Sequence, residues 1–273
     1  GKDIASFLDT KWIIKYPKHL VFPLAKYLSG FVKWLMDEAN FVIFSFRDFT
    51  RFIAWLIELP YNLILALISK GFLSGQGQDA IEILSPLSWI SVIAIIIFLA
   101  LYTKDKLLVF LVFFSFVYLA IFGQWESSMV TLSSIIIAVP VGVIIGLFLG
   151  ILSYKSEFLE KLISPVLDLM QTIPVFAYLV PILVMFGFGP VAALIATIIY
   201  AMPPMVRTTL LALKSVNPQI KESGLMSGCT KRQLMWQVLI PVSKPTLMIG
   251  VNQVIMLSLN MVIIASMIGA GGL

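Results

Sequence analysis

Residues 107–125 read LLVFLVFFSFVYLAIFGQW and contain no Asp, Glu, Lys or Arg. An uncharged helical run of about 18 or more residues can cross a bilayer core that is about 30 Å thick. Across the 273 residues, 60% are hydrophobic and 12% are charged, and that charged share is about half of what soluble domains carry. The mean hydropathy is +1.01. These features predict an all-α integral membrane protein.

Other apolar runs lie on both sides of this segment. Together they predict about six membrane spans, at residues 84–102, 107–122, 127–154, 162–188, 190–213 and 246–268. A polar segment, 214–245, separates the last two spans. We expect both ends of the chain to be trimmed, because it starts at Gly1 rather than Met and stops directly after a predicted span.

The N-terminal region, 1–82, is less apolar than the rest. Between residues 31 and 59, polar side chains recur at close to a 3.6-residue spacing, at Lys33, Asp37, Asn40, Arg47, Arg51 and Glu58. A narrow polar stripe on a wide apolar face is typical of helices that lie in the membrane interface. We interpret 1–82 as an extracytoplasmic, interfacial amphipathic tail that ends near a loop at 74–79. A spanning helix whose stripe faces protein stays open as the alternative.

The positions of Lys and Arg give an orientation. They fall after the first, third and fifth spans, at Lys104, Lys106, Lys155, Lys161 and through 214–245, whereas the connections at 123–126 and 187–190 have none. Because cytoplasmic loops are enriched in Lys and Arg, the basic loops are predicted to be cytoplasmic and the N-terminal tail to lie outside. The net charge of +5 therefore reflects topology, and we expect a lipid membrane rather than nucleic acid as the partner.

Helix packing is visible in the span at 127–154. Small residues recur every four positions, at Ser134, Ala138, Gly142, Gly146 and Gly150. In lipid, a small-residue stripe lets another helix backbone approach closely. The stripe predicts a packing ridge. Prolines also lie within predicted spans, at Pro140, Pro174, Pro181, Pro203 and Pro204, and predict kinks.

Polar side chains inside two spans mark a candidate translocation pathway. If 162–188 is one helix, Asp168, Gln171, Thr172 and Tyr178 share a face, and in the last span Asn252, Met256 and Asn260 do so, with Gln253 beside them. A polar side chain in lipid is costly, so these faces are predicted to point inward, to each other or to water. Interhelical hydrogen bonding is the alternative role. We expect Ile195 to face lipid.

The polar segment 214–245 has the signals of two short cytoplasmic helices around a glycine turn. The first opens at Asn217 and Pro218, as a cap and first turn. Gly224 and Gly228 allow the chain to bend. Thr230, with Gln three residues later, is a capping box that opens the second helix. Two later prolines then mark the entry to the last span.

This segment resembles the cytoplasmic signature of ABC importer permeases, which reads Glu-Ala-Ala, three residues, Gly, nine residues, Ile-x-Leu-Pro. At the same spacing the chain has Glu222, Ser223, Gly224, Gly228, Val238, Ile240 and Pro241. Both alanines are replaced, although by small residues. In that family the loop is a coupling helix that docks on the ATPase subunit. The resemblance therefore implies ATPase contact by Glu222, Ser223, Gly224, Gly228, Ile240 and Pro241.

A closer resemblance covers about 164–273. PVLDLMQTIPVFAYLVPILVMFGFG (165–189), YAMPPMVRTT (200–209) and GVNQVIMLSLNMVIIASMIGAGGL (250–273) are similar to permeases of glycine betaine/proline betaine importers. The resemblance implies a type I ABC importer fold in the bacterial inner membrane, with 83–125 as two peripheral helices, 126–273 as the core and a seventh span beyond residue 273. It implies a second permease copy, ABC ATPase subunits and an extracytoplasmic solute-binding protein as partners. The solute would be glycine betaine, proline betaine, choline, carnitine or trimethylamine N-oxide.

Other function classes fit the sequence less well. An ion-coupled secondary transporter needs ionisable residues within spans, and only Asp168 and Arg207 qualify. An intramembrane enzyme is disfavoured because the spans hold no paired carboxylates and no Ser–His arrangement. The lone His19 and the single Cys229 predict no metal site, no internal disulfide and no cofactor. No G-x-x-x-x-G-K-[ST] motif occurs, so ATP would be bound by a partner subunit.

Overall fold

The computed structural model describes residues 46–74 and 81–267, together with positions 27, 30 and 34. Gly1–Thr50 and Arg51–Leu273 form separate compact units. Most of the predicted N-terminal tail and residues 75–79 of the predicted loop lie outside the described residues.

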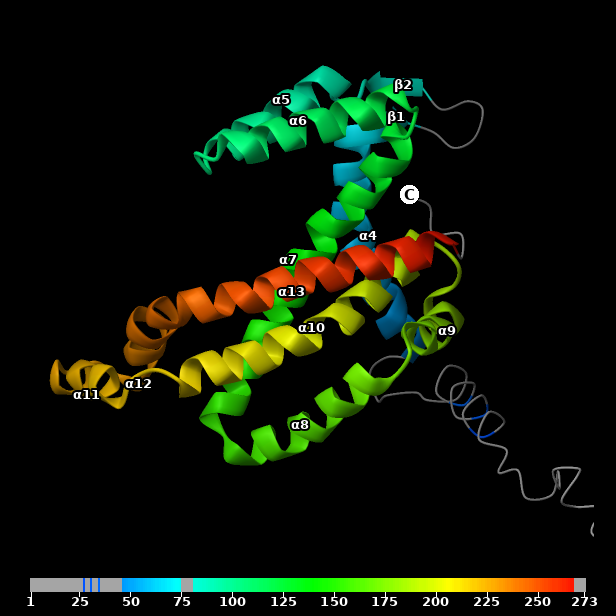
Figure 1. Ribbon diagram of the computed structural model, residues 1–273. Coiled ribbons are helices and arrows are strands. Elements are labelled where there is room, and N and C mark those ends of the chain that lie inside the picture. Colours follow the sequence, from blue (N-terminus) through cyan, green and yellow to red (C-terminus); the bar gives the residue numbers. More distant parts are fainter. Residues whose placement is uncertain (1–26, 28–29, 31–33, 35–45, 75–80, 268–273) are drawn as a thin grey trace, which may run out of the picture. The chain divides into compact units, whose positions relative to one another are not determined.

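The second unit is dominated by helices (Figure 1). Its elements, with the helix that leads into it, are α4 Phe46–Leu65, the π-helix η2 Ala66–Lys70, β1 Phe72–Ser74, β2 Ile81–Leu84, α5 Trp89–Leu101, α6 Lys106–Ile121, α7 Trp125–Lys155, α8 Glu157–Thr172, α9 Val175–Phe186, α10 Pro190–Lys214, α11 Pro218–Met226, α12 Lys231–Gln233, the π-helix η4 Leu234–Leu239 and α13 Ile240–Ala265.

One small element was not predicted from the sequence. Strands β1 and β2 pair antiparallel, with Phe72 opposite Leu84. Gly71 ends the preceding π-helix at a φ of 72°, and its N–H bonds to the Ala66 carbonyl. The hairpin is an addition to a fold that is otherwise helical in the described residues.

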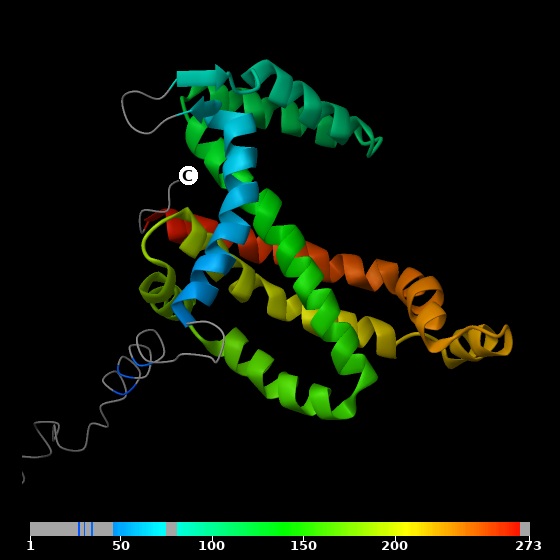
Figure 2. The same ribbon diagram turned by 180° about the vertical axis from the view of Figure 1, so that it is seen from behind.

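The centre of the second unit is formed by α7, α10 and α13, which lie against one another (Figures 1 and 2). The predicted small-residue ridge of α7 is confirmed, since all five of its residues are buried. A Cβ added at Gly146 would lie 2.6 Å from the Met205 Cβ of α10, and one at Gly150 would lie 2.5 Å from the Thr209 Cβ. Such distances are well inside an optimal carbon–carbon contact of about 3.5–4.0 Å. Glycine is therefore what permits the close approach of α7 and α10.

Helix α4 packs on this centre. Its Tyr61 and Leu65 lie in one buried cluster with Ile137 of α7 and with Leu194 and Ile198 of α10, where α4 crosses α7 in Figure 2. The helical stretch Asp48–Lys70 has 23 residues, or about 35 Å at 1.5 Å per residue. It is long and apolar enough to cross a membrane, so the spanning and interfacial interpretations of this segment both remain open.

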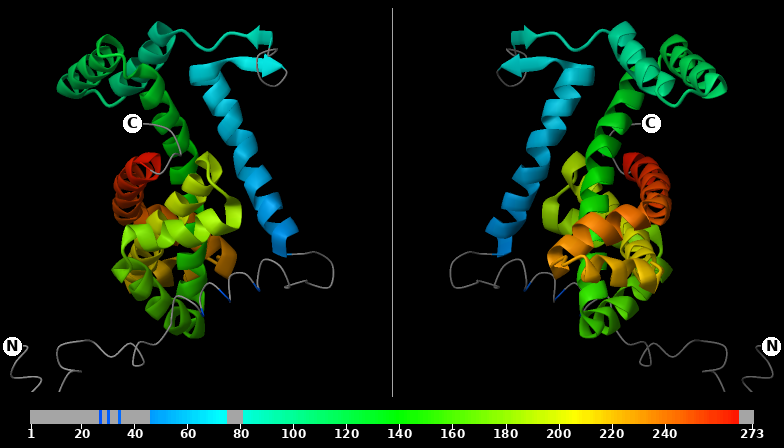
Figure 3. Two further views of the ribbon diagram at one scale, coloured as in Figure 1. Left: turned by 90° about the vertical axis from the view of Figure 1, so that its right-hand side faces the viewer. Right: turned by 90° about the vertical axis from the view of Figure 1, so that its left-hand side faces the viewer.

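The predicted count of six spans is not settled by helix length. In the described residues, four helices are long and apolar enough to span: Asp48–Lys70, Trp125–Lys155, Pro190–Lys214 and Lys231–Ala265. Helices α5 and α6 have 13 and 16 residues, or about 20 and 24 Å. They pair with each other, away from α13 (Figure 3).

The segment predicted as a span at 162–188 is not one continuous helix. Helices α8 and α9 meet at a bend of 103°. Ile173 is extended, with ψ at 131°, and Pro174 precedes the first residue of α9. A proline disfavours the helical conformation of the residue before it and cannot donate a backbone hydrogen bond. The pair is therefore a broken span or a re-entrant loop.

Candidate functional site

The segment between α10 and α13 is capped as predicted at its start. The Asn217 carboxamide oxygen accepts a hydrogen bond from the Gln219 N–H at 3.0 Å, and Pro218 is the first helical residue of α11. The helix ends at a turn in which the Gly228 N–H bonds to the Leu225 carbonyl at 3.0 Å and the Cys229 N–H bonds to the Gly224 carbonyl. This turn reverses the chain toward α12.

The capping box at Thr230 is also confirmed. Its hydroxyl accepts from the Gln233 N–H at 3.3 Å, and the Gln233 side-chain oxygen accepts from the Thr230 N–H at 2.9 Å. We expected a separate short helix to start here, and that prediction is wrong. The helix continues through η4 into α13 as one helical stretch, Lys231–Ala265. Pro241, expected at the entry to the last span, lies inside this stretch, directly after η4, where its missing N–H removes one intrahelical hydrogen bond.

The two glycines of the loop have roles that differ from the expected ones. Gly224 does not bend the chain, because it lies inside α11. An added Cβ there would lie 2.6 Å from the Leu234 Cδ1, so Gly224 is a point of close packing. At Gly228 a side chain would not clash, since no atom lies within 4 Å of an added Cβ. The φ of +79° is what favours glycine at this position.

The remaining signature residues divide into an exposed set and a packed set. Glu222 and Ser223 are exposed on α11, and the Ser223 hydroxyl bonds back to the Gln219 carbonyl at 2.8 Å. At the other end of the signature, Ile240 is half-buried in two of the apolar clusters, and Pro241 is exposed. The exposed set is available to a partner, and the packed set joins the loop to the spans.

Sequence reasoning missed the residues that anchor the loop. Leu234, Met235 and Leu239 are buried in one cluster with Ile151 of α7 and Leu213 of α10. These three residues are one, four and five positions apart, as on the apolar face of a helix. This spacing is the signal in the sequence that could have identified them. In addition, the Ser243 hydroxyl donates to the Ala212 carbonyl at 3.1 Å, across α13 and α10. The loop is therefore fixed to the ends of three long helices.

The polar face predicted across 162–188 does not exist as one face. Asp168, Gln171 and Thr172 lie on α8 and are exposed, whereas Tyr178 lies on α9, beyond the bend. The Thr172 hydroxyl bonds within its own helix, to the Leu169 carbonyl at 2.9 Å. The Tyr178 hydroxyl donates to the Met170 carbonyl, which ties α9 back to α8.

The sequence did not predict that these residues have partners on α10. Asp168 forms an ion pair with Arg207, and about two turns away Glu160 pairs with Lys214 at 2.6 Å. Tyr178 stacks edge-on against Tyr200, with ring centroids 5.7 Å apart. Two ion pairs and a ring contact therefore connect the broken pair α8–α9 to α10.

On α13 the predicted polar residues do share one exposed side of the helix. Asn252, Gln253 and Asn260 are exposed, as is Met256. The opposite side, with Val254 and Met261 at 0% exposure, packs against the centre. The polar side is therefore available to solvent, to lipid or to another chain.

Two further expectations concern the placement of Ile195 and metal binding. Ile195 does not face outward, because it is 6% exposed and lies in the cluster between α9, α10 and α13. Among the described residues, no group of three or more His, Cys, Asp or Glu side chains could hold a metal ion.

Comparisons with known proteins show which family the chain resembles. Residues 142–273 match the family described as binding-protein-dependent transport system inner membrane component. The chain is 32% identical over 226 residues to the glycine betaine transport system permease protein of Bacillus subtilis, covering 82% of this chain and 78% of that one. It is 34% identical over 252 residues to the glycine betaine/proline betaine transport system permease protein of Escherichia coli, covering 92% of this chain and 66% of that one.

Two relatives are much longer than this chain. The trimethylamine N-oxide transport system permease protein of Ruegeria pomeroyi is 33% identical over 262 residues, which is 96% of this chain. The one of Pelagibacter ubique is 40% identical over 232 residues, which is 83% of this chain. The aligned part is 38% and 32% of the lengths of these two relatives.

Proposed function

The chain belongs to the family of binding-protein-dependent transport system inner membrane components, and from this membership we propose that it forms the translocation pathway of an ATP-driven importer. Its fold is the type I ABC transmembrane fold. It is a multi-pass protein of the bacterial inner membrane. The observation that carries the proposal is the anchored loop, whose exposed helix α11 is fixed to α7, α10 and α13 through Leu234, Met235 and Leu239.

The loop supports coupling to a partner that hydrolyses ATP. A partner that moves α11 would act on Leu234, because Gly224 and Leu234 are in close contact. Leu234 in turn packs with the ends of α7 and α10. Glu222 and Ser223 are exposed on α11 and are the proposed contact residues. The partners of this chain would be ABC ATPase subunits that bind the ATP, a second permease copy and an extracytoplasmic solute-binding protein.

The solute that we propose is a small molecule with a methylated nitrogen, of the class of glycine betaine, proline betaine, choline, carnitine or trimethylamine N-oxide. The relatives are named for solutes of this kind. Tyr178 and Tyr200 are half-buried and in ring contact near the bend between α8 and α9. The face of a tyrosine ring attracts a methylated ammonium group without a counter-charge that would hold it fast. The exposed amides at Gln171, Asn252 and Asn260 would serve the polar end of the solute.

An ion-coupled secondary transporter is the second candidate function, and the ion pair counts against it. Asp168 and Arg207 are the ionisable residues that the sequence places within spans, and they pair with each other. A coupling carboxylate must gain and lose its ion during transport. The Asp168 carboxylate is already paired with the Arg207 guanidinium, so a coupling ion would have to displace that partner. The pair is better explained as a link between α8 and α10.

The test is co-purification and ATPase stimulation with the complete importer. We expect Glu222→Lys, and separately Gly228→Val, to reduce solute-stimulated ATPase activity at least tenfold while the permease stays in the membrane. Gly123→Val is the matched control, because Gly123 also has a positive φ, of +69°, and open space around it, but lies in another loop. Stimulation equal to that of the control in both loop variants would overturn the assignment of the loop. Transport without any ATPase partner would overturn the importer proposal itself.

A further inference from the structure

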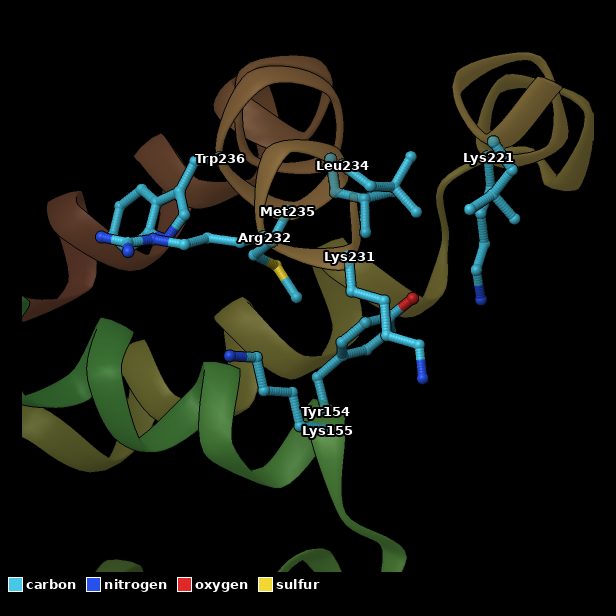
Figure 4. Close-up of a pocket in the computed structure, with 10 residues that line it drawn as sticks. Tyr154, Lys155, Lys221, Lys231, Arg232, Leu234, Met235 and Trp236 are labelled. Atoms are coloured by element: carbon cyan, nitrogen blue, oxygen red, sulfur yellow. The ribbon is translucent and has the colours of Figure 1, made fainter. Parts of the chain in front are cut away.

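A hollow of about 670 Å³ lies beside the loop, and its wall includes Leu234, Met235 and Leu239 of the anchoring cluster (Figure 4). It is bounded by the last residues of α7, by one side of α11 and by the start of the stretch α12–η4. The residues that line it are Tyr154, Lys155, Lys221, Leu225, Lys231, Arg232, Leu234, Met235, Trp236 and Leu239. Four of these ten are cations, and six are apolar or aromatic.

The charge of the hollow is uncompensated within the described part of the chain. None of its lining residues is acidic, and the ion pairs of the described residues join other cations, Arg207 and Lys214, to carboxylates. Lys155, Lys221, Lys231 and Arg232 are all exposed. Four like charges around one hollow repel each other, so an anion bound between them would be stabilised.

The position of the hollow relates it to the membrane. Lys155 is the last residue of the candidate span Trp125–Lys155, and Lys231 is the first residue of the candidate span Lys231–Ala265. The cations therefore lie where two spans meet the water. Trp236, which follows Lys231 and Arg232 near the start of the second span, is 55% exposed. Tryptophan is enriched at the headgroup region of membranes.

We propose that this hollow binds the phosphate headgroup of an anionic membrane lipid. The cations would bind the phosphate, and the exposed apolar side chains of Leu225 and Trp236 would contact the glycerol and the first methylenes of the acyl chains. A free phosphate ion would use the cations and leave the apolar lining exposed. A basic hollow between membrane helices on the cytoplasmic side is a recognised form of lipid headgroup site. The inference depends on the chain spanning a membrane and not on which solute it transports.

The test measures lipid binding by native mass spectrometry of the full chain in neutral detergent, with phosphatidylglycerol and phosphatidylcholine as probes. A basic residue near an anionic lipid is worth about fivefold in binding, so Lys155→Gln/Arg232→Gln is expected to weaken phosphatidylglycerol binding about thirtyfold. Lys104→Gln/Lys106→Gln is the matched control, because it removes the same charge from another loop. Lys155→Arg/Arg232→Lys keeps the charge and is expected to bind as the wild type does, which separates loss of the site from loss of folding.

Each other outcome counts against the proposal. Equal weakening in the hollow and control variants would mean that only the net charge attracts the lipid. Equal binding of phosphatidylcholine would remove the role of the anionic headgroup. Full displacement of the lipid by millimolar inorganic phosphate would assign the hollow to a soluble anion. Release of the lipid when the ATPase subunit binds would assign the cations to an acidic surface of that partner.

Discussion

The close approach of α7 to α10 predicts that alanine will have different effects on stability at three glycines of one ridge. Adding a methyl group at Gly150 places its carbon 2.5 Å from the Thr209 Cβ and 2.9 Å from the Val206 carbonyl oxygen. At Gly146 the nearest atom is the Met205 Cβ, at 2.6 Å. At Gly142 the nearest atom is a Val254 methyl carbon, at 3.5 Å, which is an ordinary contact. The three substitutions to alanine are chemically identical and differ only in these distances.

The expected magnitudes follow from two opposing effects. Alanine favours a helix interior over glycine by about 1 kcal/mol at every position. Overpacking of a well-packed core costs about 1–3 kcal/mol, and it applies at Gly146 and Gly150, where Cβ atoms and backbone oxygens leave little freedom to move. We therefore expect Gly142→Ala to be neutral or stabilising by up to about 1 kcal/mol, and Gly150→Ala to be destabilising by up to about 2 kcal/mol. A separation of about 2 kcal/mol corresponds to roughly 4–8 °C in melting temperature for a chain of this size.

The assay is thermal unfolding of the detergent-solubilised permease, followed by fluorescence-detected size exclusion at a series of temperatures. Gly142→Ala is the internal control, since it lies on the same ridge of the same helix. Equal melting temperatures for Gly142→Ala and Gly150→Ala would refute the packing argument, because the helix-propensity effect alone is the same for both.

Three further predictions concern the pathway and the topology. For Asp168 and Arg207, whose side chains are 66% and 42% exposed, a double-mutant cycle of Asp168→Asn and Arg207→Gln on melting temperature should give a coupling energy of about 0.2–1 kcal/mol, and a coupling of zero would mean that this ion pair does not stabilise the contact between α8 and α10. Cysteines placed at Gln171, Asn252 and Asn260 should react with small hydrophilic thiol reagents at rates that change with ATP. A control cysteine, Val254→Cys, replaces a side chain at 0% exposure and should stay unreactive. If the three cysteines do not react and transport is unharmed, these residues are packing groups. Reporters fused after Lys106, Lys155 and Ser227 should lie in the cytoplasm, with residues 1–80 outside, and a cytoplasmic N-terminal tail would mean that α4 is a true span.

The sequence predicted those features that depend on neighbours along the chain. The α7 ridge follows from a spacing of four residues, the Thr230 capping box from a spacing of three and the Asn217 cap from the adjacent proline, and all three are present. They could be predicted because each is a property of one helix or one helix end. The family could be predicted for the same reason, since its signature is a set of spacings within one loop.

The features that sequence reasoning missed depend on distances through space. The sequence predicted a kink at Pro174 but not the 103° bend between α8 and α9, because a proline shows that the helix is interrupted and not the angle at which the next helix continues. The role of Gly224 rests on a contact with Leu234, ten positions later. Ile195 was expected to face lipid, but in a membrane protein buried and lipid-facing side chains are equally apolar, so composition does not distinguish them.

Helix α11 is connected to the pathway residues Asn252 and Asn260 through the helical stretch Lys231–Ala265. Helix α11 contacts the stretch Lys231–Ala265 through Gly224 and Leu234, and that stretch is continuous except that Leu234–Leu239 is wound as a π-helix. A π-helical turn is rare and is found frequently at functional sites. Three of the six residues of η4, Leu234, Met235 and Leu239, are themselves buried against α7 and α10, and beyond η4 Ser243 is tied to α10. A partner pressing on α11 would therefore act on a π-helical segment that is packed into the centre. Its displacement would be passed to α7 and α10 as well as to the part of α13 that carries Asn252 and Asn260.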